Sequence, residues 1–221
     1  MVTQETILQQ HIVSLRTRLL LMCAAVSVAV EDMVHAFETR DVGRAAAVID
    51  GDNDIDALEN EIDDKALKLM ACTQPVAGDL RFVVSALRMV LDLERIGDEA
   101  SSMAEGCILL QDMPPYVIMD EVQVFLHQSR NAYEQAVAAF RSNDIAAALA
   151  LARTEDDATQ GEVRLLHRCM QAVLAHEVDE QAFMHIVLII RAATRIWRRS
   201  ANIAEHVYFS LHGDSLKHCP K

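Results

Sequence analysis

Apolar residues recur at intervals of three and four along most of the chain, which is the spacing that places side chains on one face of an α-helix. The clearest stripe consists of Val83, Leu87, Val90, Leu93, Gly97, Ala100 and Ala104. No stretch alternates apolar and polar residues in the way that predicts a β-strand. The pattern therefore predicts an all-α protein.

Prolines and short polar stretches divide this pattern into long segments. The four prolines are Pro75, Pro114, Pro115 and Pro220, and softer breaks occur near residues 40–43, 142–144 and 175–179. We predict six helices, at about residues 4–40, 43–73, 76–111, 117–141, 144–176 and 179–212.

Two ordered blocks of the sequence occur twice. Residues 36–42 match residues 139–145 at an offset of 103, and residues 94–105 match residues 194–205 at an offset of 100. Repetition at a nearly constant offset indicates a duplicated unit of three helices. We therefore expect two tandem, related three-helix bundles, at residues 1–112 and 117–213, followed by a tail at 214–221.

The charge of the chain is acidic and unevenly distributed. Its formal net charge is −13, and residues 1–120 contain 21 acidic and 9 basic side chains, against 12 and 11 in the remainder. This balance argues against nucleic acid as the main ligand. The low content of glycine and proline excludes collagen-like and turn-rich all-β classes.

The cysteines and the longest apolar run indicate a soluble cytoplasmic protein. Cysteines stand at positions 23, 72, 107, 169 and 219, too dispersed for redox or zinc motifs, and we expect buried thiols in a reducing compartment. The longest nearly apolar run, Leu19 to Val30, has 12 residues, which is too short to cross a bilayer. We expect no direct membrane insertion.

Acidic residues border the apolar stripes of the second and third predicted helices. They are Asp52, Asp56, Glu59 and Asp63 on the second helix and Glu94, Asp98 and Glu105 on the third. If the helices are antiparallel neighbours, these carboxylates face one another and repel, and a hard metal ion would offset the repulsion. A solvated acidic face, partly neutralised by nearby bases, is the alternative on spacing alone.

The motifs of common enzyme classes are missing from the sequence. It contains no Gly-x-Ser-x-Gly, no phosphate-binding glycine loop, and none of the Glu-x-x-His pairs that ferritin-like oxidation chemistry uses. We therefore expect no catalysis, with a metal-dependent carboxylate-bundle oxidoreductase as the alternative.

The last predicted helix carries a basic cluster where the third carries acids. Arg191, Arg195 and Arg198 share one face, with Arg199 beside them, and Trp197 occupies the position of Gly97. This cluster is either a solvated face paired with nearby acids or a docking surface for an acidic partner.

The segment Gln74–Arg81, followed by Asp92–Asp98, resembles the PhoU family of phosphate-signalling proteins. The resemblance covers essentially the whole chain. It implies a commonly dimeric, cytoplasmic regulator that restrains phosphate uptake and the phosphate-starvation response. Its implied partners are the ATP-binding subunit of the phosphate ABC transporter and the PhoR histidine kinase.

The resemblance also implies a metal site. Carried over residue by residue, the acidic motifs of the family place Asp52, Asp56, Glu94 and Asp98 around iron, manganese or another hard cation. The second repeat departs from the pattern, because Gln160, Thr194 and Arg198 replace three of the four acids. We therefore expect no second metal centre, and we expect Arg198 to pair with Asp156 or Glu155.

Overall fold

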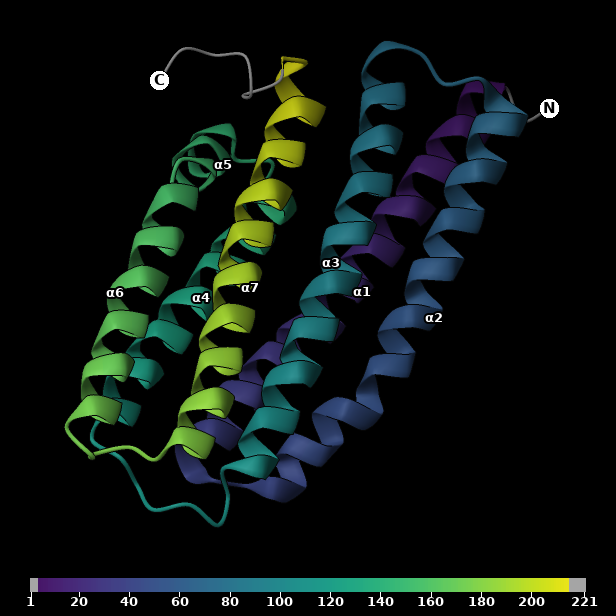
Figure 1. Ribbon diagram of the computed structural model, residues 1–221. Coiled ribbons are helices and arrows are strands. Elements are labelled where there is room, and N and C mark those ends of the chain that lie inside the picture. Colours follow the sequence, from purple (N-terminus) through teal and green to yellow (C-terminus); the bar gives the residue numbers. More distant parts are fainter. Residues whose placement is uncertain (1–3, 215–221) are drawn as a thin grey trace.

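The computed structural model describes residues 4–214, and within that range it contains seven α-helices and no strand (Figure 1). The predicted all-α fold is confirmed. The expected tail at 214–221 lies outside the described residues apart from Asp214, as do the first three residues of the chain. The helices are α1 (Gln4–Thr39), α2 (Val42–Thr73), α3 (Ala77–Leu109), α4 (Ile118–Ser142), α5 (Ile145–Ala152), α6 (Glu155–Leu174) and α7 (Glu180–His212).

The turn between α1 and α2 is repeated between α4 and α5. Arg40 and Asn143 both adopt left-handed backbone with φ of 54°. The next residue, Asp41 or Asp144, caps the following helix, because its carboxylate accepts a hydrogen bond of 3.0 Å from the backbone N–H three residues later. These equivalent turns stand 103 residues apart, which is the offset of the sequence repeat.

The single helix expected at 144–176 is wrong, because Arg153 and Thr154 separate α5 from α6. The Trp197 indole on α7 donates a hydrogen bond from Nε1 to Thr154 Oγ1 at 2.9 Å. Trp197 stands at the repeat position of Gly97. In the first repeat α2 packs closely on Gly97, whereas in the second repeat the indole ring occupies the equivalent space. Neither glycine nor proline marks the break, and the sequence therefore carried no signal for it.

The helices form two groups that meet along α3 and α7. Helices α1, α2 and α3 pack on one another, α4, α5 and α6 surround α7, and α3 runs antiparallel to α7 in the middle of the molecule (Figure 1). The stripe predicted on α3 faces the core, and within it only Leu87 is half-buried. The acidic edge of α3 consequently lies toward α2, and its opposite edge lies toward α7.

The apolar part of helix α1 extends beyond the 12-residue run from Leu19 to Val30. By length and composition alone, Ile7–Thr39 would be sufficient to cross a membrane, since its most apolar 18 residues have a mean hydropathy of 1.7. Here the helix packs against α2, α3 and α4 and buries Leu15 and Leu19, whereas Val13 and Val28 on its outer face are exposed.

The cysteines do not share one environment. Cys23 and Cys169 are buried and Cys107 is half-buried, but Cys72 is exposed. The prediction of uniformly buried thiols is therefore wrong at Cys72, which points outward near the end of α2 while Leu69, one turn earlier, faces the core. Cys219 lies outside the described residues.

Candidate metal centre

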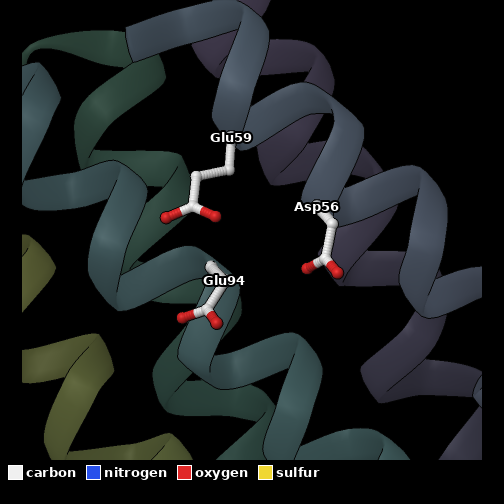
Figure 2. A group of neighbouring side chains, drawn as sticks. All are labelled: Asp56, Glu59 and Glu94. Atoms are coloured by element: carbon white, nitrogen blue, oxygen red, sulfur yellow. The ribbon is translucent and has the colours of Figure 1, made fainter.

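Three carboxylates from α2 and α3 converge on one point between the helices. Figure 2 shows Asp56 and Glu59 projecting from α2 toward Glu94 on α3. One oxygen atom from each of these side chains lies within 4.8 Å of the others, and no other group of three potential ligands this close occurs in the described part of the chain.

A glycine on α3 lets α2 approach at the level of these acids. A Cβ atom added to Gly97 would lie 3.0 Å from Cδ1 of Ile55 and 3.2 Å from Oδ1 of Asp52. Ile55 is buried in the core, so it cannot readily give way. Gly97 therefore serves close packing between the helices, as its position in the apolar stripe indicated, and this packing sets the distance between the two acidic edges.

The structure brings together two of the four acids that the family resemblance implied and adds a third. Asp56 and Glu94 belong to the convergent group, and Glu59 completes it. Asp52 and Asp98 lie one turn away on their helices, close enough that their charges interact with each other. Glu59 was visible in the sequence as part of the acidic stripe, but only the packing of α2 on α3 shows that it faces Glu94.

The crowding of carboxylates raises their pKa values. Burial, followed by the charges of Asp98 and Glu59, raises the pKa of Glu94 to about 7, although the neighbouring Arg95 opposes this effect. Burial, Asp63 and Asp56 raise the pKa of Glu59, and burial and Asp98 raise that of Asp52. The metal-free centre is thus a place where negative charge is unfavourable, and an added cation would relieve that cost.

The donor set fits a hard cation. All three converging groups offer carboxylate oxygen, which suits magnesium, calcium, manganese or iron better than soft metals. Oxygen ligands lie about 2.0–2.6 Å from such ions, so two ligands on opposite sides of an ion are separated by about 4–5 Å. The spacing within 4.8 Å is compatible with this geometry. Asp56, Glu59 and Glu94 would hold the ion, and Asp52 and Asp98 would add negative charge around it.

The equivalent region of the second repeat is built from paired charges. Arg198 donates hydrogen bonds from Nε and Nη2 to Oε1 of Glu155, at 3.1 and 2.8 Å, so the expected pairing of Arg198 with Glu155 or Asp156 is confirmed. Arg195 pairs with Glu99 on α3, and its Nη2 lies 2.6 Å from Oε2. In this half of the chain a guanidinium supplies the positive charge beside the acids.

Comparison with known proteins identifies the family of this chain. The family model described as PhoU domain matches residues 19–106. A phosphate-specific transport system accessory protein PhoU homolog from Pseudomonas aeruginosa is 31% identical over 207 residues, which cover 92% of this chain and 84% of the relative. The corresponding homolog from Aquifex aeolicus is 28% identical and covers 89% of both chains.

Solved structures agree in fold. The crystal structure of PhoU from Pseudomonas aeruginosa superposes with a TM-score of 0.89 at 29% identity, covering 93% of this chain and 99% of that one. PhoU from Streptococcus pneumoniae, a phosphate transport system regulatory protein, superposes with a TM-score of 0.86 at 20% identity, a likeness of fold alone. Taken with the sequence identity over nearly its full length, these likenesses show that the chain belongs to the PhoU family.

Proposed function

We propose that the protein is a non-catalytic regulator of phosphate homeostasis, which restrains phosphate uptake and the phosphate-starvation response. The observation that carries this proposal is the likeness, over nearly the whole chain, to accessory proteins of the phosphate-specific transport system. The relatives are named as accessory proteins of a transport system, which supports a regulatory role.

The acidic centre acts in this proposal as a structural or modulatory metal site. Iron, manganese or another hard cation bound by Asp56, Glu59 and Glu94 would neutralise the repulsion between α2 and α3. The ion would bind in competition with the proton that Glu94 holds near neutral pH. Binding would therefore stiffen the pair formed by α2 and α3 and present one arrangement of these helices to a partner.

The partners follow from the family resemblance. The protein would work in the cytoplasm, commonly as a homodimer, between the ATP-binding subunit of the phosphate ABC transporter and the PhoR kinase. The relatives are named for the phosphate transport system, which supports the transporter side of this assignment. A family member that serves a sodium-coupled phosphate carrier would share the fold and differ in the partner.

The decisive experiment is deletion of the gene, followed by an alkaline phosphatase assay in phosphate-rich medium. We expect constitutive alkaline phosphatase, because the starvation response would lose its restraint. Unchanged repression would contradict regulation through the PhoR kinase. Phosphate uptake by the same strain would then show whether another carrier is the target.

The carboxylates on facing helices also favour one candidate from another class, a metal-dependent oxidoreductase. Protein loaded with Fe(II) would consume oxygen catalytically if this second candidate were correct. Absence of oxygen turnover, together with constitutive alkaline phosphatase in the deletion strain, would exclude the oxidoreductase and support the regulatory role.

A further inference from the structure

A basic groove lies between α3 and α7, next to the acidic centre, and Arg95 contacts both. This open groove has a volume of about 470 Å³ and is lined by Arg88, Leu91, Asp92, Arg95, Arg199 and His206. On each helix the basic residues are seven positions apart, which places them on one face two turns apart. The lining carries three guanidinium groups against one carboxylate, in a protein whose net charge is −13.

Side chains of α7 contact Asp92, which carries the one carboxylate of the groove lining. Asp92 is buried, and its Oδ1 accepts a hydrogen bond of 3.0 Å from Nη1 of Arg199 while its Oδ2 lies 3.2 Å from Nε2 of His206. Asn202 also approaches Oδ1, at 3.5 Å. Asp92 thus fixes Arg199 and His206 at the floor of the groove, and its negative charge is already shared among several donors.

Arg199 differs from the arginines beside it in how its donors are used. Arg195 and Arg198 each direct two nitrogen atoms at a glutamate. Arg199 gives Nη1 to Asp92, but its Nε is buried without a hydrogen-bond partner among the residues that the structure describes. The planar guanidinium fork is well suited to bind an oxyanion through two parallel hydrogen bonds.

Two further arginines stand at the walls of the groove. The Arg88 guanidinium lies over the ring of Phe209, 5.7 Å from its centroid, and a guanidinium stacked in this way can still donate hydrogen bonds from its edge. Arg95 is 60% exposed, and its Nε lies 3.2 Å from Glu94. Arg88, Arg95 and Arg199 therefore bring three positive charges to one opening, and Arg95 also pairs with Glu94 at its edge.

We propose that this groove binds a phosphate-type oxyanion, which would be inorganic phosphate or a small molecule that carries phosphoryl groups. These ligands share a multiply charged phosphoryl group. Two oxygen atoms of such a group can accept parallel hydrogen bonds from one arginine guanidinium. The volume is larger than a single phosphate ion needs, so pyrophosphate and ATP are compatible with it as well. The inference rests on the arginines themselves and goes beyond the proposed regulatory role.

Titration calorimetry of the full chain tests this inference, with inorganic phosphate, pyrophosphate and ATP as separate probes at equal ionic strength. The buffer contains chelator, so that no metal ion at the acidic centre can bind the probe. We expect at least one probe to bind, and the probe that binds most tightly identifies the source of the ligand. Binding of none of them would overturn the proposal.

Substitutions locate the binding. Arg88→Gln should weaken it about tenfold, since the charge-assisted hydrogen bonds of one arginine are lost, and Arg199→Gln should weaken it at least as much. Arg198→Gln, which removes the same charge from the neighbouring position on α7, should leave affinity within about twofold. If Arg199→Gln does not fold, Arg88→Gln alone decides. Equal losses in Arg88→Gln and Arg198→Gln would show a diffuse charge effect and overturn the site.

Discussion

Replacing Glu94 by glutamine should stabilise the metal-free protein above neutral pH. The pKa of Glu94 is raised from 4.5 to about 7 by burial and by the charges of Asp98 and Glu59. Between these two pH values the folded state holds a proton that the unfolded state has released, so stability falls as the pH rises through this window. Above about pH 7 the loss is complete, and glutamine avoids it because it cannot ionise.

The magnitude follows from the raised pKa. A carboxyl group that ionises near 7 rather than 4.5 costs the folded state about 3 kcal/mol once it is charged. The Glu94 side chain retains 20% of its surface in solvent, which screens part of this cost. We therefore expect Glu94→Gln to raise the free energy of unfolding by about 2 kcal/mol at pH 8, or the melting temperature by about 4–8 °C.

The assay is urea unfolding followed by circular dichroism, in chelator, at pH 8 and pH 5. The gain should be present at pH 8 and largely absent at pH 5, where Glu94 is protonated in the folded wild type. Glu105→Gln is the matched control, since Glu105 is an exposed residue of the same helix. An equal gain in both variants, or a gain at pH 5 as large as that at pH 8, would refute the argument.

The other predictions concern packing and the second repeat. Gly97→Ala should lower stability by about 1–3 kcal/mol in thermal melts, because the added methyl group meets side chains of α2. Gly51→Ala, whose methyl group meets nothing within 4 Å, should leave stability unchanged or raise it by up to about 1 kcal/mol. Arg198→Ala should cost only about 0–1 kcal/mol, since its pair with Glu155 is half-exposed. Arg198→Asp should cost more in chelator, by carboxylate repulsion, and equal melts for the two variants would contradict this.

Much of the fold could be predicted from the sequence because its signals are local. Helical periodicity, helix caps and prolines depend on neighbouring residues, and the ends of the long helices lie within about two residues of their predicted positions. The break at Arg153 and Thr154 depends instead on Trp197, more than forty residues away. A contact between distant segments leaves no mark in a local pattern.

The candidate site likewise depends partly on local sequence motifs and partly on contacts between distant segments. Asp56 and Glu94 could be selected because their motifs resemble those of a family, but the inclusion of Glu59 depends on how α2 rotates against α3. The spacing of residues in the sequence could not show which acidic side chain pairs with each arginine of α7. In the structure Arg199 of α7 pairs with buried Asp92 of α3, and both residues line the groove between the two bundles.

Calorimetric titration of chelator-treated protein with Mn²⁺ tests whether Asp56, Glu59 and Glu94 hold a hard cation. We expect saturable binding by the wild type, at least tenfold weaker binding by Glu59→Gln, and loss of binding in the double variant Asp56→Asn with Glu94→Gln. Glu105→Gln, which also removes one negative charge from the first bundle, should bind as the wild type does. Binding that is absent from the wild type, or equal in the wild type and the double variant, would show that these three carboxylates form no metal site.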